Sequence, residues 1–377
     1  MFKNQYVFIR NAVLVVLVCN TLYWLFPFRP ILWRLLLVFF AVYLIVNEKK
    51  RLFCEKAVLL FAGFVFLHFL ISFIWSIPSL TILGNVLCAL LTLELFTCLS
   101  EKGVMTERFI AILAFLLVIV AIPYFFHYRV EMLSDFEATG EINADITNNA
   151  SALFLMLLPI LFLLKNPIQQ WVSFMVCLFF IILSAKRGNI IAAVIPSLLF
   201  AYGALKDNKH SVLKTIAVIV AIVIASFFLF NWAMNNDYLM YRVEQTIEGN
   251  SSRRDVIYAN AWNAWASAES LFTLLFGYGY MGASVRAGVG PAHSDWLEFL
   301  VDFGLFGVLF YLFIFIVFFK QVRRTHAFET RIAMLAALLI WFFKSVYSMG
   351  IVANDMLYLM VTLGIALGRY KLNEMSL

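Results

Sequence analysis

Two pairs of cationic side chains stand beside apolar runs. Lys186 and Arg187 are followed by Gly188 and fall between two strongly apolar stretches. Arg253 and Arg254 directly precede a segment with helical periodicity. A guanidinium binds phosphate through two parallel hydrogen bonds, and an ammonium adds a point charge. These four residues are therefore predicted to bind an anionic group, although such cations also pair with nearby acids or lipid phosphates.

A cluster of ionisable side chains opens a later apolar stretch. His293, Asp295, Glu298 and Asp302 follow one another closely, and the sequence beyond them is apolar. Glu298 and Asp302 are one helical turn apart, so these acids share part of a helix face. A neutral imidazole can take a proton from a hydroxyl group, and a protonated one can donate to phosphate. We predict His293 as a catalytic residue, with Asp295 or Glu298 as its helper or as a rival base; a cap or surface role for the histidine stays open.

Metal and cofactor signatures are missing from the sequence. There is no zinc-type His/Cys cluster, no phosphate-cradling glycine loop and no Asp-x-Asp pair. The five cysteines have no paired spacing and are interpreted as small apolar residues. We therefore expect neither a metal site nor a cofactor.

Membrane-spanning helices are the elements expected to position these residues. The chain is 64% hydrophobic and 13% charged, against roughly 25% charged residues in ordinary soluble proteins. A spanning helix needs about 20 mostly apolar residues, and such stretches follow one another almost end to end. The predicted class is an all-α, polytopic membrane protein with about 12 spans. These spans are 9–28, 31–47, 56–77, 79–99, 108–127, 149–165, 168–185, 189–205, 212–233, 294–319, 329–349 and 352–370.

The distribution of charge predicts the orientation. Lys and Arg concentrate on one set of connecting segments, which marks that side as cytoplasmic. Residues 1–377 are predicted to form a single membrane domain with both termini in the cytoplasm. A large periplasmic loop, residues 235–292, is expected between the ninth and tenth spans. The loop should carry an amphipathic interfacial helix with Tyr258, Trp262 and Trp265 on one face. The net charge of +6 fits cytoplasmic loop bias, so no nucleic-acid partner is expected.

Four motifs in order carry a resemblance to a known family. They are Ser184-Ala185-Lys186-Arg187-Gly188, Arg254 ahead of the aromatic helix, Gly277-Tyr278-Gly279-Tyr280, and His293 through Gly307. Over roughly residues 184–310 this set resembles the O-antigen ligase and O-antigen polymerase superfamily of bacterial membrane glycosyltransferases. Lys186, Tyr258 and Ser294 depart from what many relatives carry there. Gly277 to Tyr280 by themselves indicate only a flexible turn.

The resemblance implies an enzyme of the bacterial inner membrane whose active site faces the periplasm. Its donor would be an oligosaccharide linked to undecaprenyl diphosphate, and its acceptor a glycolipid within the bilayer. The family's arginines map onto Arg187 and Arg254, and its histidine onto His293. Arginines aimed at the departing diphosphate would stabilise its charge without a metal.

Several functions stay open at this point. A polymerase, with a chain-length regulator as a further partner, would extend a lipid-linked repeat unit of O-antigen or capsular polysaccharide. A ligase would transfer the glycan to lipid A-core. A transporter or flippase of an anionic lipid-linked substrate would also place cations and acids within spans. The absence of paired repeats and the clustering of charge on one face favour an enzyme over a transporter. A scaffold protein would not need these clusters.

Overall fold

A computed structural model describes residues 2–26, 30–47, 51–73, 80–139, 150–184, 186–206, 254–286 and 292–374. Every regular element in these ranges is a helix, which confirms the predicted all-α class for this part of the chain. The helices are α1 (Phe2–Thr21), η1 (Tyr23–Leu25), α2 (Pro30–Asn47), α3 (Phe53–Ser72), α4 (Leu80–Glu101), α5 (Glu107–Thr139), α6 (Ser151–Leu161), α7 (Pro167–Leu183), α8 (Arg187–Lys206), α11 (Arg254–Ala266), α12 (Leu271–Phe276), α13 (Gly282–Arg286), α14 (Asp295–Arg324), α15 (Phe328–Tyr347) and α16 (Met356–Glu374).

Within the described residues, six helices are long and apolar enough to cross a bilayer. They are Pro30–Asn47, Phe53–Ser72, Leu83–Glu101, Glu107–Val130, Asp295–Arg324 and Phe328–Tyr347, and the shorter apolar helices are Ser151–Leu161, Pro167–Leu183 and Arg187–Gly203. This pattern is that of a multi-pass membrane protein. The predicted ninth span, 212–233, and much of the predicted loop 235–292 lie outside the described residues. The count of twelve spans and the periplasmic placement of the loop therefore remain predictions.

The centre of the bundle is built on close backbone contact and on a helix that is apolar all round. α16 packs along α4, where a Cβ on Gly364 would lie 2.5 Å from the Leu93 carbonyl oxygen. A Cβ on Gly368 would lie 2.5 Å from the carbonyl oxygen of Thr97. Two glycines four residues apart let the backbones of two helices approach closely. In lipid such close packing drives helix association, because no hydrophobic effect acts between the helices. Every residue of α6 is buried, as expected for a helix enclosed by other helices.

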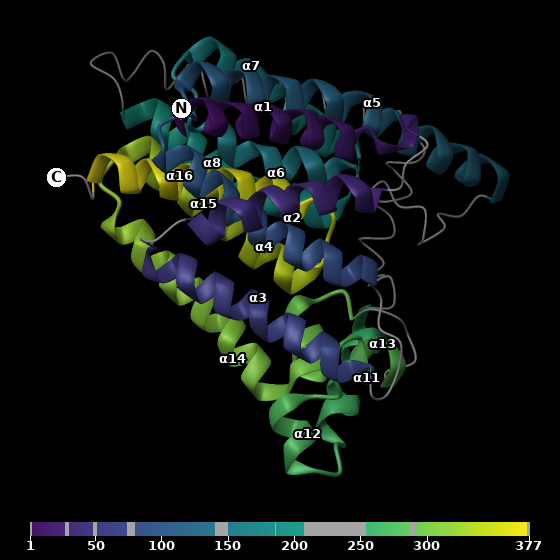
Figure 1. Cartoon of the computed structure of the whole chain (residues 1–377). Helices are drawn as coiled ribbons and strands as arrows, with labels where there is room; N and C mark the ends of the chain where they lie inside the picture. Colours follow the sequence, from purple (N-terminus) through teal and green to yellow (C-terminus); the bar gives the residue numbers. More distant parts are fainter. Residues whose placement is uncertain are drawn as a thin grey trace.

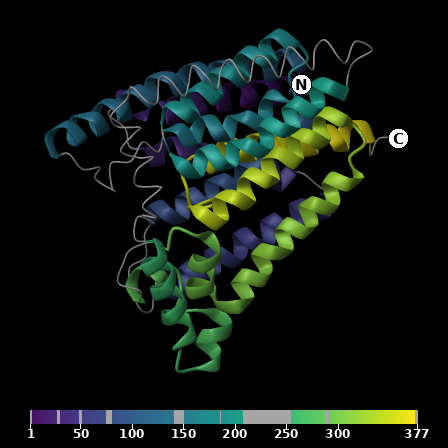
Figure 2. The same cartoon turned by 180° about the vertical axis from the view of Figure 1, so that it is seen from behind.

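The arrangement of the helices brings distant segments to one end of the molecule. Both chain termini lie toward the other end of the bundle, and α3 lies beside α14 (Figure 1). The view from behind shows the same pairing, with α11, α12 and α13 gathered where α14 begins (Figure 2). α8 and α14 both pack against α15. Near its C-terminal end, α15 is contacted by Arg254, the first residue of α11, and by Ser294, the residue before α14.

Candidate active site

His293 lies in a turn that is held from three sides. The backbone N–H of Ala292 donates to Glu298 Oε2 at 2.6 Å, and Tyr258 Oη donates to the His293 carbonyl oxygen at 3.3 Å. Ser294 Oγ donates to the carbonyl oxygen of Ser345 at 3.2 Å. His293 itself has φ 52°, the left-handed region that few non-glycine residues adopt. The turn therefore fixes the backbone while the side chain of His293 remains exposed.

Two cations from distant segments lie near enough to this histidine to affect its charge. Partial removal of solvent from the imidazole lowers the pKa of His293 below its ordinary value of 6.5, and the charges of Arg254 and Lys186 lower it further. Positive neighbours disfavour the imidazolium ion, so His293 is neutral at pH 7. Lys186 precedes α8 and Arg254 begins α11, and the fold brings both close to the start of α14.

Arg254 is anchored to the end of α15. Its Nη1 donates to the carbonyl oxygen of Tyr347, the last residue of that helix, at 2.6 Å. The final carbonyl groups of a helix have no partner within the helix and carry partial negative charge. The hydroxyl group of Tyr258, one helical turn after Arg254, also lies 3.4 Å from the Val346 carbonyl oxygen, so its hydrogen is shared between that oxygen and the His293 carbonyl oxygen. One face of α11 thus joins the end of α15 to the His293 turn.

The remaining predicted cations are Arg187 and Arg253. Arg187 is the first residue of α8 and is half-buried. Asn189 in the same turn is buried, and its Nδ2 donates to Ser151 Oγ of α6 at 2.7 Å. This bond fixes the start of α8 and hence the Lys186–Arg187 pair. Arg253 lies outside the described residues.

Asp295 is buried and fully engaged by hydrogen-bond donors. Its Oδ1 accepts from the backbone N–H of Gly350 at 2.8 Å. Its Oδ2 accepts from Tyr311 Oη at 2.8 Å, Ser345 Oγ at 2.9 Å and the backbone N–H of Ile351 at 2.8 Å. A carboxylate with four donors is stabilised as an anion and has few lone pairs left for substrate. The bonds instead tie the first turn of α14 to the segment between α15 and α16.

Glu298 and Asp302 are likewise buried and turned toward the backbone. Glu298 accepts from Ala292, as described above. Asp302 accepts from the backbone N–H groups of Met281 and Ala283, both at 2.9 Å. Both acids lie one helical turn apart in α14, as the predicted shared face requires. Within the described residues they accept hydrogen bonds from backbone groups, and these bonds fix the chain just before α14 and at the start of α13.

The α12–α13 segment crosses α14 at Gly304, and this contact, here named the glycine crossing, sets the position of the loops. α14 is broken at Gly304, where φ is 66° and ψ is −163°. The break frees two helix carbonyl groups, and these accept from the α12–α13 segment: Tyr278 N–H donates to Val301 O at 2.8 Å, and Gly279 N–H to Asp302 O at 2.9 Å. A Cβ on Gly304 would lie 2.4 Å from the carbonyl carbon of Leu275. The segment predicted as a flexible turn is in fact locked against α14.

Sequence reasoning missed a buried ion pair beside the site. Lys344 Nζ lies 2.7 Å from Asp355 Oδ2, with the lysine 5% and the aspartate 17% exposed. The two residues flank the segment that binds Asp295. A lysine inside an otherwise apolar stretch was the available signal, because such residues are costly in a span without a partner. Tyr258 was noted as an aromatic residue and as a departure from the family pattern, but its spacing of four from Arg254, which places both on one face, was not used.

Part of the predicted aromatic face of α11 packs on the protein, and part of it is exposed. Trp265 Nε1 donates to the Leu274 carbonyl oxygen at 3.0 Å, and Tyr258 bonds the His293 turn. Trp262 remains 52% exposed. The predicted interfacial helix is α11, which ends at Ala266 and is followed by the separate helix α12. α11 is therefore largely packed on α13 and α14, and only part of its aromatic surface is open.

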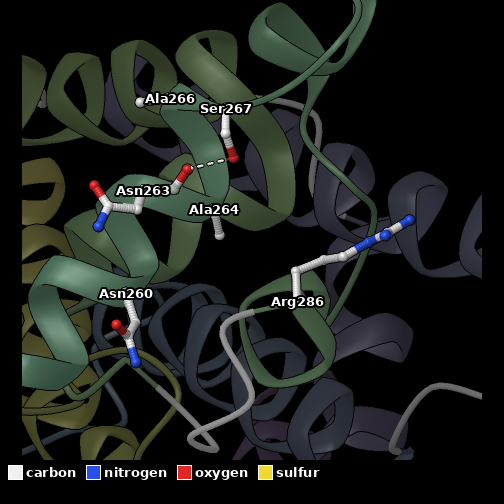
Figure 3. A pocket seen from close by; sticks show the side chains of 6 residues that line it. All are labelled: Asn260, Asn263, Ala264, Ala266, Ser267 and Arg286. Atoms are coloured by element: carbon white, nitrogen blue, oxygen red, sulfur yellow. Dashed lines mark hydrogen bonds between the residues drawn. The ribbon is translucent and has the colours of Figure 1, made fainter.

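A polar recess borders α11 on another side (Figure 3). It measures about 620 Å³ and is lined by Asn260, Asn263, Ala264, Ala266, Ser267 and Arg286. As for metals, no group of three or more His, Cys, Asp or Glu residues in the described ranges is arranged to hold an ion.

The fold and site together define a class, an all-helical multi-pass membrane protein with a cationic, histidine-containing site at one end of its bundle. Residues 172–312 match the family model described as O-antigen ligase. This region contains Lys186, Arg187, Arg254 and His293, and the match confirms the resemblance to the O-antigen ligase and polymerase superfamily. It supports a membrane glycosyltransferase of that type. A comparison with curated proteins gives no match.

Proposed function

We propose that this protein is a polymerase that transfers glycan from undecaprenyl diphosphate to a growing lipid-linked repeat unit at the periplasmic face of the bacterial inner membrane. The observation that carries the proposal is the convergence of Lys186 and Arg254 on a neutral His293, within the region that matches the family model. Cations to hold a diphosphate and an uncharged base beside them are what such a transfer needs.

In the proposed reaction the acceptor hydroxyl attacks the anomeric carbon of the donor sugar. A bond forms between the acceptor oxygen and that carbon, and the bond from the carbon to the diphosphate oxygen breaks. The electron pair leaves with the diphosphate, whose growing charge is stabilised by Arg187, Arg254 and Lys186. Arg253, adjacent in sequence to Arg254, would add to the same cationic group. The proton of the acceptor hydroxyl passes to His293.

Asp295 and Glu298 receive a different role from that first predicted. Because both carboxylates accept hydrogen bonds from buried partners, we propose that they position the His293 turn and the end of α15. The reaction then needs no carboxylate base. The chain's own cations supply the charge stabilisation, so we expect activity to persist in EDTA.

The second candidate function is a ligase that transfers the glycan to lipid A-core. The description of the matching family model, O-antigen ligase, is the observation that favours it. Both reactions release the same diphosphate, so the same cations and His293 would serve either. Only the identity of the acceptor distinguishes the polymerase from the ligase.

The test is transfer by purified protein in detergent, with EDTA, from a lipid-diphosphate-linked repeat unit. A ladder of products supports the polymerase; a single product that requires lipid A-core supports the ligase. Arg254→Gln should reduce the rate on the order of 100-fold, by analogy with loss of one oxyanion-hole donor, and Arg187→Gln should have a similar effect. His293→Gln should cost roughly 100-fold or more. Matched controls are Arg324→Gln, at the far end of α14, and His326→Gln, two residues beyond it; both side chains are exposed.

Folding of each variant can be monitored with a thiol-reactive dye, because Cys54, Cys88, Cys98 and Cys177 are buried. Only a few-fold loss for both Arg187→Gln and Arg254→Gln would refute the assignment of the diphosphate site. Failure of the folded protein to transfer to either acceptor would instead favour a transporter.

A further inference from the structure

The recess beside α11 lies on a different face of that helix from the cationic site. Arg254, Tyr258 and Trp265 follow a spacing of four and seven, and their side chains bond neighbouring segments. Asn260 and Asn263 lie elsewhere around the same helix and line the recess with Ser267 just beyond its end. At about 1.5 Å per residue, the recess starts roughly 9 Å along the helix from Arg254. One short helix thus presents two separate polar surfaces.

The lining of the recess is suited to a hydroxyl-rich ligand. Each asparagine amide offers two donors and an acceptor, and the serine hydroxyl offers both functions. The wall contains alanine rather than large apolar groups, so an apolar chain would bury little surface there. A volume of about 620 Å³ lies in the range of small-molecule sites, roughly 300–1,000 Å³.

Arg286 gives the recess a preference for negatively charged ligands. It lines the recess from α13, on the side opposite Asn260 and Asn263, and its side chain extends away from the two asparagines (Figure 3). Its guanidinium carbon lies 5.0 Å from the centre of the Tyr278 ring. Within the described ranges no carboxylate lies at ion-pair distance from it. A guanidinium held in this way binds a carboxylate through two parallel hydrogen bonds.

The position of Arg286 is fixed by the same contacts that organise the site. Tyr278 Oη donates to the Ala264 carbonyl oxygen of α11 at 3.1 Å, and its backbone N–H donates to Val301 O. Asp302 holds the start of α13. These bonds set the distance between the two walls before any ligand binds, which lowers the entropic cost of binding.

We infer that this recess is a saccharide subsite that binds an acidic sugar of the acceptor glycan, with Arg286 on the sugar carboxylate and Asn260, Asn263 and Ser267 on its hydroxyl groups. The inference rests on the proposed function, which it deepens by naming the class of acceptor.

The experiment measures binding without catalysis. Two water-soluble probes are titrated into purified protein in uncharged detergent: an oligosaccharide ending in a uronic acid, and the same oligosaccharide with that carboxyl group reduced to the alcohol. The uronic acid should bind the unaltered protein at least tenfold more tightly, because a hydrogen bond to an ionised carboxylate is stronger than one to a neutral hydroxyl group. Arg286→Gln should abolish this preference, whereas Arg324→Gln should leave it unchanged. Asn260→Ala combined with Asn263→Ala should weaken both probes.

Three outcomes would overturn the inference: equal affinity for the two probes, a preference that survives Arg286→Gln, or no binding of either probe. Displacement of the uronic acid by micelles containing phosphatidylglycerol, with no Arg286-dependent saccharide preference, would assign the arginine to lipid headgroups instead. A failure of this inference can be distinguished from a failure of the proposed function. Uronate binding by protein that transfers no glycan would refute the polymerase and retain the subsite, whereas transfer without Arg286-dependent binding would do the reverse.

Discussion

Replacement of Gly304 by alanine tests whether the glycine crossing holds the site together. Gly304 has φ 66° and ψ −163°, a region that side-chain-bearing residues avoid. An added Cβ would also lie 2.4 Å from the carbonyl carbon of Leu275 and 2.6 Å from the backbone nitrogen of Gly277. These are backbone atoms, so no side-chain rotation can relieve the contact. The two segments must separate or the kink must change.

The cost follows from two contributions. A strained backbone conformation at a non-glycine residue costs on the order of 1–3 kcal/mol. Separation of the segments breaks two hydrogen bonds, from Tyr278 N–H to Val301 O and from Gly279 N–H to Asp302 O, worth about 0.5–1.5 kcal/mol each. We therefore expect Gly304→Ala to lower the free energy of unfolding by roughly 2–6 kcal/mol. Because Asp302 would shift with the backbone, helix α13, which carries Arg286, should move as well.

The assay is thermal unfolding in detergent, followed with a thiol-reactive dye that reports exposure of the buried cysteines. Gly63→Ala is the matched control, because a Cβ there meets no atom within 4 Å and Gly63 lies in the interior of helix α3. Gly277→Ala should resemble Gly304→Ala, since its Cβ would lie 2.3 Å from the Asp302 carbonyl carbon. The double variant should lose less stability than the sum, as both changes break the same two bonds. The reasoning is refuted if Gly304→Ala unfolds at the same temperature as Gly63→Ala.

Two further predictions concern the proposed proton acceptor and its neighbours. The rate of transfer should fall as the pH drops through the pKa of His293, which lies below 6.5, because only neutral imidazole accepts a proton. Arg254→Gln removes a charge that lowers this pKa, so the acid limb should move to higher pH, whereas Arg254→Lys should leave it in place; identical limbs in the pH–rate profiles of both variants would contradict this. Asp295→Asn should lower the free energy of unfolding by about 2–4 kcal/mol, because the amide cannot accept all four donors, and leave the acid limb unmoved. Activity lost at full thermal stability would instead make Asp295 a catalytic base.

Much of the helical plan could be predicted from local composition. The stretch predicted as 329–349 is α15, Phe328–Tyr347, and the stretch predicted as 189–205 is α8, Arg187–Lys206. Bilayer-length apolar runs bounded by charged or turn residues define such helices with little help from tertiary contacts. The kink at Gly304 could not be predicted in this way. It depends on the approach of Leu275 and Gly277, which are close to it only in the folded chain.

The residue types of the site were also visible in the sequence, but their roles were not. Lys186, Arg254 and His293 were singled out as chemically unusual, and the structure places all three near one another. Asp295 and Glu298 looked equally suited to proton transfer. Their partners, the backbone groups of Ala292, Gly350 and Ile351, could not be inferred from spacing, because two of the three belong to a segment far along the chain.

The sequence by itself determined that this protein lies in lipid, that it is helical, and which chemically active side chains it carries. Apolar runs and isolated charges give this information because each residue has its own free-energy cost of placement in lipid. Only the tertiary structure decided which charges act together. Arg254 reaches the last carbonyl group of α15, Asp295 is occupied by that helix and the segment after it, and Arg286 of α13 lines a recess together with residues of α11. Each of these contacts joins residues far apart in the chain, so it depends on how the helices pack.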